Sequence, residues 1–470
     1  MSKTFLSLPR SRATRSGCCP RMRGWAALLA LGLVACGGGG ESGSSGGDTV
    51  APPVSCSSSD LKTWLSDYFD HSYFWYAIGP RPSPGASASV GAHFDALLYA
   101  GGTPPFPADR WSNYESTESF NRFYGDGQTL GYGVSVAGLE VSGQPAQPLY
   151  VRGVDPGSPA ALAGVVRGDR VLAINGRATP EILAPAEPDF SALSPTVAGQ
   201  SLTLSLRSAS GADRTVTLTA AVYALTPVPR VQTLSTVAGR KVGYIDVRNM
   251  VSQVQVPLEA AFAGFRTQAV QDVVLDLRYN GGGLVSMGRT VASYVAGTRA
   301  AGQVYAKLLY SDKRAALNES FSFTSPASAA SLPRVYVLTG RRTCSASEQV
   351  INGLRGAGIQ VFAVGETTCG KPVGFLPESD SCGTTYSVVN FESVNRNNEG
   401  RYFDGFMPTC SVAEDWTQPV GGAADPLVRT ALLLADGGAC ASGASAGALK
   451  SAARGRWGAE PGERQQMLGR

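Results

Sequence analysis

The chain contains very little histidine and little lysine. Its 470 residues include only two histidines, His71 and His93, so none lies between residues 94 and 470. A Ser-His-Asp triad takes its general base from histidine, and a triad in the larger C-terminal part of the chain would have to recruit one of these two. Only seven lysines stand against 33 arginines. Because a lysine can become neutral and act as a base whereas an arginine stays charged, each lysine is a candidate.

Other features are also missing. No block of basic residues occurs, and the net charge of +4 is spread along the chain, so a nucleic-acid partner is not expected. No pair of cysteines has the CxxC spacing of a zinc site. We therefore expect no metal and no cofactor.

The N-terminal apolar run is too short to span a bilayer. Trp25 to Ala35 suits the core of a signal peptide, and a short buried helix is the alternative interpretation. The run ends in Leu33-Val34-Ala35-Cys36, which resembles the lipobox of bacterial lipoproteins, where the cysteine is lipid-modified. We expect a lipoprotein signal peptide over residues 1–36 and a Gly/Ser linker over 37–55. The protein would then be lipid-anchored in the bacterial cell envelope, with the outer membrane favoured, facing the periplasm.

Residues 56–128 predict a small helical N-terminal module. Apolar side chains recur at helical spacing between Asp60 and Phe69. Tyr73-Phe74-Trp75-Tyr76 forms a dense aromatic cluster. Packing of this cluster against a neighbouring domain is favoured over a binding patch.

From residue 129 apolar and polar residues alternate, which indicates strands. Ser158-Pro159 suits the start of a short helix, and Asn175-Gly176 suits a turn with positive φ. The segments 157–161, Gly-Ser-Pro-Ala-Ala, and 168–176, Gly-Asp-Arg-Val-Leu-Ala-Ile-Asn-Gly, resemble a PDZ domain of the bacterial protease-associated type. The resemblance implies a β-rich PDZ domain over residues 129–225 that binds an extended peptide and its C-terminal carboxylate. The carboxylate loop would be Gly131-Tyr132-Gly133-Val134.

Residues 230–436 alternate predicted strands and helices, which favours a largely parallel α/β core. Within it, residues 333–375 predict a strand, a sharp turn, a helix, a second strand and a loop. Such crossover units place chemistry at the carboxyl ends of their strands. One of these turns offers Ser345 and the other Lys371, and we expect the two side chains to meet. Residues 437–470 are rich in Ala, Gly, Ser and Arg and predict a disordered tail.

Three turns at strand ends carry the candidate residues. They are Asn280-Gly281-Gly282-Gly283, Ser345-Ala346-Ser347-Glu348, and Gly365-Glu366-Thr367-Thr368-Cys369-Gly370-Lys371. In this order, behind a PDZ domain, they resemble the motifs of the carboxyl-terminal processing peptidases, or tail-specific proteases. These are serine peptidases with a Ser–Lys dyad.

The resemblance implies a multidomain α/β protein with a ClpP/crotonase-like peptidase core. Ser345 would be the nucleophile, Lys371 the general base and Glu348 an orienting group. The backbone N–H groups of Gly282 and Ala346 would bind the oxyanion. The substrates would be polypeptides captured by their C-termini.

The chemistry of the residues supports this interpretation. A serine hydroxyl needs an adjacent base, and burial keeps a lysine neutral. A shift of the lysine pKa from about 10.4 to roughly 7–8 needs on the order of 4 kcal/mol. Two alternatives remain: Ser345-x-x-Glu348 is also a helix capping box, and the glycines before Lys371 imitate a phosphate-binding loop. Pro372 stands where that loop needs Ser or Thr, so no nucleotide is expected.

Six cysteines remain if Cys36 is lipidated and the two before it are removed. They are Cys56, Cys344, Cys369, Cys382, Cys410 and Cys440. An even number in an oxidising compartment predicts disulfides, and six cysteines allow 15 pairings. Cys344 and Cys369, each beside a proposed active-site turn, make an attractive pair.

One position departs from the family pattern. Many members place a glutamine four residues beyond the lysine, where it orients the base, and Phe375 stands there in this chain. The sequence predicts a serine-type endopeptidase. The alternative is a catalytically weak or dead homologue that binds and tethers peptides through its PDZ domain.

Overall fold

The computed structural model describes residues 50–185, 188–440, 464 and 467–469. The predicted signal peptide and Cys36 lie outside the described residues. Of the predicted linker, residues 50–55 are described, and they form neither helix nor regular strand. Within the described part of the chain, no helix has both the length and the hydropathy needed to cross a membrane.

The N-terminal module is helical, as predicted. It contains α1 (Ser58–Ser72), α2 (Val90–Leu97) and α3 (Thr117–Tyr124), with strand β1 (Asn113–Ser116) before α3. The Ser57 hydroxyl accepts the Asp60 N–H at the start of α1, which stabilises that end of the helix. Tyr73 and Trp75 are buried in a core that also contains Val373 and Phe375 of the later part of the chain. The aromatic cluster therefore packs between domains.

The predicted PDZ domain contains a six-stranded antiparallel sheet. Its strands are β3 (Val134–Val136), β4 (Leu149–Val154), β5 (Arg170–Ile174), β6 (Arg177–Ala178), β7 (Ser201–Arg207) and β8 (Asp213–Thr219). Ser158 caps the short helix α4 (Pro159–Leu162) by accepting the Ala161 N–H. Asn175 and Gly176 have φ values of 49° and 79°, as the predicted turn requires. A separate pair, β2 (Gln128–Gly131) and β9 (Ala221–Ala224), lies where the chain enters and leaves the domain.

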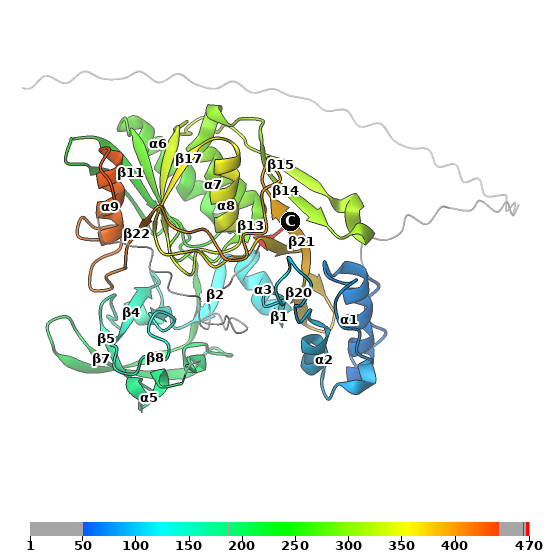
Figure 1. Cartoon of the computed structure of the whole chain (residues 1–470). Coiled ribbons are helices and arrows are strands. Elements are labelled where there is room, and N and C mark those ends of the chain that lie inside the picture. Colours follow the sequence, from blue (N-terminus) through cyan, green and yellow to red (C-terminus); the bar gives the residue numbers. More distant parts are fainter. Residues whose placement is uncertain (1–49, 186–187, 441–463, 465–466, 470) are drawn as a thin grey trace, which may run out of the picture. The chain divides into compact units, whose positions relative to one another are not determined.

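Residues 230–436, the predicted peptidase core, are built on a mostly parallel sheet of six strands (Figure 1). In order across the sheet they are β10 (Arg230–Ser235), β11 (Lys241–Asp246), β12 (Asp272–Asp276), β16 (Arg334–Thr339), β17 (Gln360–Gly365) and β22 (Cys410–Ser411). Only β10 runs antiparallel to its neighbour. The predicted parallel core is confirmed.

Helices cover both faces of this sheet. α6 (Gln255–Thr267), α7 (Val285–Ala296) and α8 (Ala346–Gly356) lie on one face, and α9 (Pro426–Ala435) lies on the other. Since side chains alternate along a strand, Val337 of β16 joins the first core and its neighbour Leu338 joins the second. The burial of both faces explains why these strands are continuous apolar runs.

A second six-stranded sheet has an edge strand that begins at Gly283, the last residue of the predicted Asn280–Gly283 turn. Its order is β13 (Gly283–Leu284), β23 (Met467–Leu468), β18 (Val373–Phe375), β21 (Val389–Val394), β14 (Val304–Tyr310) and β15 (Glu319–Ser322). A three-stranded sheet joins β1 to β20 (Thr384–Ser387) and β19 (Glu378–Ser379).

The prediction of a disordered tail is wrong for residues at both ends of it: Cys440 forms a disulfide, Arg464 forms a salt bridge, and two residues form a strand. Met467 and Leu468 form β23 between β13 and β18, and their exposed fractions are 0% and 1%. The prediction rested on composition averaged over residues 437–470, which hides two adjacent apolar side chains. The two strands that bury them, β13 and β18, are distant in sequence, so no local sequence pattern predicts this pairing.

Three disulfides are formed, and they use all six predicted cysteines. The pairs are Cys56–Cys382, Cys344–Cys369 and Cys410–Cys440. The expected pair beside the active-site turns is confirmed.

Candidate active site

Ser345 occupies a strained turn between β16 and α8. Its φ and ψ are 62° and −119°, a region that side-chain-bearing residues rarely adopt and that concentrates at functional sites. The backbone oxygen of Asn280 holds the turn by accepting the Cys344 N–H at 3.1 Å and the Ser347 hydroxyl at 3.0 Å. Ser345 is fully buried, and its Oγ has no hydrogen-bond partner among the described residues. A buried hydroxyl without a hydrogen-bond partner lowers the stability of the fold and calls for an explanation, of which a catalytic role is one.

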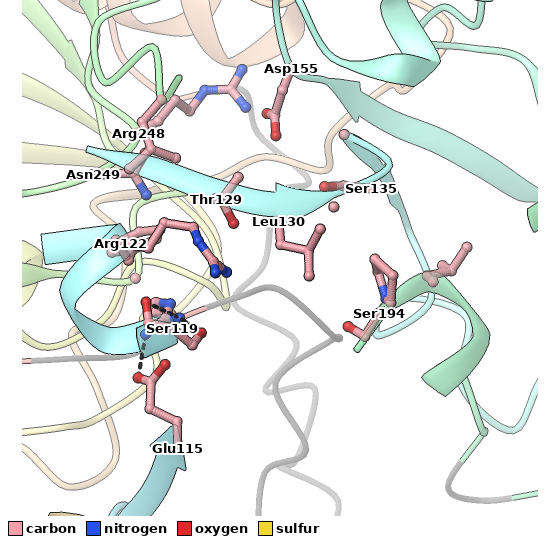
Figure 2. Close-up of a pocket in the computed structure, with 18 of the residues that line it drawn as sticks. Glu115, Ser119, Arg122, Thr129, Leu130, Ser135, Asp155, Ser194, Arg248 and Asn249 are labelled. Atoms are coloured by element: carbon pink, nitrogen blue, oxygen red, sulfur yellow. Dashed lines mark hydrogen bonds and ion pairs between the residues drawn. The ribbon is translucent and has the colours of Figure 1, made fainter. Parts of the chain in front are cut away.

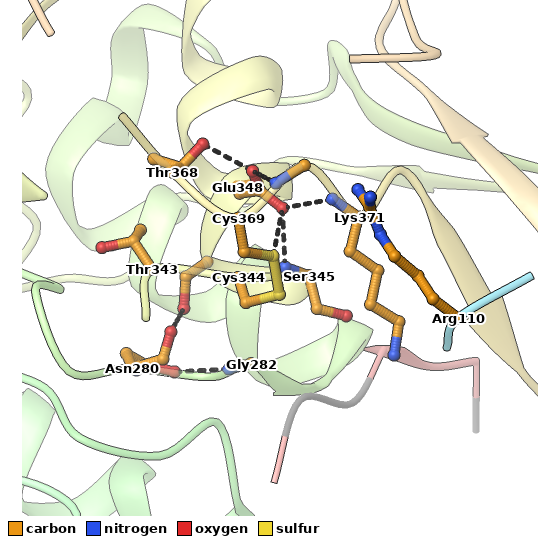
Figure 3. The surroundings of a disulfide bond; sticks show 12 residues. Arg110, Asn280, Gly282, Thr343, Cys344, Ser345, Glu348, Thr368, Cys369 and Lys371 are labelled. Atoms are coloured by element: carbon orange, nitrogen blue, oxygen red, sulfur yellow. Dashed lines mark hydrogen bonds between the residues drawn. A yellow bond between two sulfur atoms is a disulfide. The ribbon is translucent and has the colours of Figure 1, made fainter. Parts of the chain in front are cut away.

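Lys371 lies on the loop between β17 and β18 and is also fully buried. Burial lowers the pKa of its ammonium group to about 7, against the opposing effects of Asp109 and Glu348. Figure 3 shows the Ser345 hydroxyl directed toward the Lys371 side chain. The two side chains thus lie on the same side of the turn and the loop, and direct contact between the hydroxyl and the amine stays a prediction.

Glu348 connects the two turns. Its carboxylate accepts the N–H of Ser345 at 3.0 Å and the N–H groups of Gly370 and Lys371 at 2.8 Å each (Figure 3). It also accepts the Thr368 hydroxyl at 2.5 Å. Burial raises the pKa of this carboxyl, and the four hydrogen bonds oppose that rise. Glu348 therefore holds the Ser345 turn and the lysine loop together, and through these bonds it contacts neither Ser345 Oγ nor Lys371 Nζ.

Of the two backbone N–H groups expected to bind the oxyanion, the one of Gly282 already has a hydrogen-bond acceptor. The Gly282 N–H is donated to Oδ1 of Asn280 at 2.8 Å, so in this conformation it is engaged within its own turn, and its role as an oxyanion donor stays a prediction. The Asn280 side chain folds back on its own turn, and its Nδ2 donates to the Val247 oxygen at 2.9 Å. Ala346 is the first residue of α8, where the backbone N–H has no intrahelical acceptor.

The ring of Phe375, the residue that departs from the family pattern, lies against the lysine side chain. Its centroid lies 4.0 Å from Nζ of Lys371, a distance at which the ring face attracts an ammonium group. The Cys344–Cys369 disulfide joins the residue before Ser345 to the lysine loop. With Glu348 these two sulfurs form a cluster of metal-ligand type, but the sulfurs are bonded to each other and the cluster is not a ligand set.

The motifs alone did not identify three neighbours of the site, one inside the lysine motif and two in the N-terminal module. Thr368 lies at a variable position of the lysine motif, and nothing local marks it as a partner of Glu348. Asp109 and Arg110 come from the N-terminal module. Asp109 influences the Lys371 pKa, and Arg110 is drawn beside Lys371 in Figure 3. Only a prediction of domain packing could have placed them there.

A large cleft joins the lysine to the PDZ domain. Its volume is about 1440 Å³, and its lining includes Lys371, Gly281 and all four residues of the predicted carboxylate loop. Figure 2 shows Leu130 and Ser135, which flank that loop, on the cleft wall. A salt bridge between Arg342 and Glu140 ties the region before Ser345 to the PDZ domain.

Comparisons with known proteins agree with this architecture. Residues 241–412 match the model of peptidase family S41, and residues 150–186 match that of a PDZ domain. The carboxyl-terminal-processing protease of Picosynechococcus sp. is 29% identical over 270 residues, covering 57% of this chain and 60% of the relative. That of Synechocystis sp. is 28% identical over 289 residues, covering 61% and 64%. The chain thus spans less than two thirds of the length of these relatives.

Solved structures share the fold. A putative S41 protease from Bacteroides fragilis aligns with a TM-score of 0.61 and 25% identity, over 80% of this chain and 97% of that chain. The photosystem II D1 C-terminal processing protease aligns with a TM-score of 0.50 and 20% identity, over 80% and 98%. Residues 241–412 are therefore similar to peptidase family S41, and residues 150–186, ahead of that region, are similar to a PDZ domain.

Proposed function

We propose that this chain is a serine-type endopeptidase of the carboxyl-terminal-processing kind, with Ser345 as nucleophile and Lys371 as general base. One observation carries the proposal. A fully buried lysine, with a pKa lowered to about 7, faces a buried serine hydroxyl that lacks a hydrogen-bond partner among the described residues. A lysine that is partly neutral near pH 7 can accept the proton of that hydroxyl.

The reaction follows from these two groups. Neutral Lys371 takes the proton of Ser345 as Oγ attacks the peptide carbonyl, and the lysine then gives the proton to the leaving amine. The acyl group remains on Oγ as an ester. Lys371 next removes a proton from water, which attacks the ester, and the proton returns to Oγ as the acid product leaves.

Backbone donors would stabilise the oxyanion formed in each step. Ala346 supplies one, from the start of α8. The Asn280–Gly283 turn would supply a second if substrate draws the Gly282 N–H away from Asn280 Oδ1. The substrate oxygen would then take the place of Asn280 Oδ1, which now accepts the Gly282 N–H at 2.8 Å.

The cleft supports capture of polypeptides by their C-termini. Gly131, Tyr132, Gly133 and Val134 line the same cleft as Lys371. A peptide end held by this loop would leave upstream residues of the same peptide to extend toward the lysine.

We further propose a lipid-anchored location in the bacterial cell envelope, facing the periplasm. The three disulfides support an oxidising compartment, and the Leu33-Val34-Ala35-Cys36 motif supports lipidation. Replacing Cys36 with Ala should move the protein from the membrane fraction to the soluble fraction. An unchanged distribution would contradict the anchor.

A peptide-binding protein without turnover is the second candidate. It is favoured by Phe375 at the position of the usual glutamine and by the engaged Gly282 N–H. Purified wild type, Ser345→Ala and Lys371→Ala should be compared on an unfolded polypeptide with a free C-terminus. Cleavage by wild type alone supports the peptidase, whereas equal binding without cleavage by all three supports the second candidate.

A further inference from the structure

The short strand β23 lies in an unusual place. It pairs in parallel with β13, where Gly283 is opposite Met467 and Leu284 is opposite Leu468. On its other side Leu468 is opposite Phe375 of β18. β13 begins directly after the Gly282 turn, and β18 begins two residues after Lys371. The slot between these two strands is therefore bordered by the oxyanion turn and by the base.

The slot accepts an extended backbone with apolar side chains on both faces. The Met467 side chain packs with Val285 and Phe391 on one face, and the Leu468 side chain packs with Val251 and Val373 on the other. The Gly469 N–H donates to the Phe375 oxygen at 3.0 Å. The Met467 oxygen would lie 2.6 Å from a Cβ on Gly374, so the backbone approaches this strand closely because Gly374 has no side chain.

A second anchor holds the same segment from the N-terminal module. Arg464 forms a salt bridge with Glu115 and donates to the Ser119 hydroxyl at 2.8 Å. Its guanidinium also lies over the Phe123 ring, 4.6 Å from the centroid. Arg464 lines the cleft that contains Lys371 and the PDZ carboxylate loop.

We propose that the slot between β13 and β18 is a binding site for an extended peptide strand, and that Met467–Gly469 of this chain occupies it as a stand-in for substrate. Its ligands would be peptides with two adjacent apolar residues, of which Met-Leu is the example present. An incoming polypeptide must displace β23 to pass beside Ser345, which is fully buried in this state. The effect on turnover rests on the proposed peptidase function, but binding in the slot does not.

The test uses the full-length chain with the slot vacated by Met467→Asp and Leu468→Asp. The probe is a fluorescent hexapeptide of residues 464–469, Arg-Gln-Gln-Met-Leu-Gly, added to a Ser345→Ala background so that binding is separated from cleavage. We expect the vacated chain to bind the probe at least about tenfold more tightly than the unaltered chain, because the tethered segment competes at high effective concentration. A probe with Asp in place of Met and Leu should not bind. Met407→Asp, at a residue that is 65% exposed, is the matched control.

The rate of covalent labelling at Ser345 shows whether β23 occupies the place of substrate or only stabilises the fold. With Ser345 intact, a fluorophosphonate should label the vacated chain at least about tenfold faster than the wild type. Equal probe binding by both chains, or slower labelling of the vacated chain, would overturn the proposal. If the aspartate variant fails to fold, Met467→Ala with Leu468→Ala replaces it, and unfolding of that variant also overturns the proposal. Absence of labelling in every variant would refute the peptidase function. The hexapeptide-binding measurement would still show whether the slot between β13 and β18 binds a peptide strand.

Discussion

At the scale of single residues, Lys371 combines full burial with a pKa lowered to about 7. In the unfolded chain its pKa would be about 10.4. Between these two values the unfolded state binds a proton that the folded state does not, so stability rises as pH rises through this window. Below pH 7 the folded protein carries the full penalty, which is on the order of 4–5 kcal/mol.

Replacing Lys371 with Met should therefore stabilise the fold. We expect Lys371→Met to raise the free energy of unfolding by a few kcal/mol at pH 6 and by much less near pH 10, because the methionine has no charge to bury. Chemical denaturation at the two pH values measures this difference. Lys241→Met, at an exposed lysine, is the control and should show no such trend. A destabilised Lys371→Met at pH 6 would contradict the pKa shift.

Phe375 should tune the same lysine. Its ring attracts the ammonium form, by about 0.5–2 kcal/mol, which corresponds to roughly 0.4–1.5 pKa units. Phe375→Leu removes this attraction, lowers the pKa of Lys371 and moves the inflection of kcat/KM against pH to lower pH. Phe323→Leu, at another buried phenylalanine, should leave the inflection in place. An unchanged inflection in Phe375→Leu would show that the ring is only packing.

At the scale of elements, two similar disulfides provide a matched comparison. Cys344–Cys369 and Cys410–Cys440 have sequence separations of 25 and 30 residues. Replacing either pair with alanines should cost about 3 kcal/mol of stability. Only the first pair borders Ser345 and the lysine loop, so only its loss should lower kcat, by about 10–100-fold. Equal kcat in both double variants would contradict a positioning role for the first disulfide.

The elements of the central crossover unit could be predicted from sequence, and the second sheet could not. β16, α8 and β17 follow from a buried apolar run, a helical period and glycine stops at Gly356 and Gly358. β23 is only two residues long, and both its partners are distant in sequence. Such strands are stabilised by non-local pairing, which leaves no period in the sequence.

The candidate site also has a part that the sequence predicts and a part that it does not. Ser345, Lys371 and Glu348 lie in motifs that the chain carries intact, and the structure brings them together. The engaged Gly282 N–H depends on the rotamer of Asn280, which no motif specifies. The approach of Asp109 to Lys371 depends on domain packing.

At the scale of the whole molecule, contacts of Arg167 and Arg152 link the PDZ domain to Tyr279, the residue before the Asn280–Gly283 turn. Arg167 donates to Glu414 at 2.7 Å and to the Tyr279 hydroxyl at 2.8 Å. The guanidinium of Arg152 lies over the Tyr279 ring, 4.7 Å from its centroid. Tyr279 immediately precedes Asn280, so the position of the PDZ domain and that of the turn are mechanically connected.

Breaking this link should affect activity as well as stability. Arg167→Met removes one partner of a largely buried pair with Glu414, and we expect a loss of about 3–5 kcal/mol and at least about a tenfold fall in kcat. Arg207→Met breaks an exposed pair with Asp213 within the same domain and should change stability by less than about 1 kcal/mol. Denaturation curves and kcat for both variants decide the point. Unchanged kcat in Arg167→Met would show that the turn is held without the PDZ domain.

The most direct test of the central claim is covalent labelling of the folded protein with a fluorophosphonate, followed by mapping of the labelled residue. We expect a single modified serine, Ser345, with a labelling rate that rises with pH through a midpoint near 7 as Lys371 loses its proton. Lys371→Ala should abolish that rise. Labelling of another serine, or of Ser345 at a rate independent of Lys371 and pH, would contradict the Ser–Lys dyad.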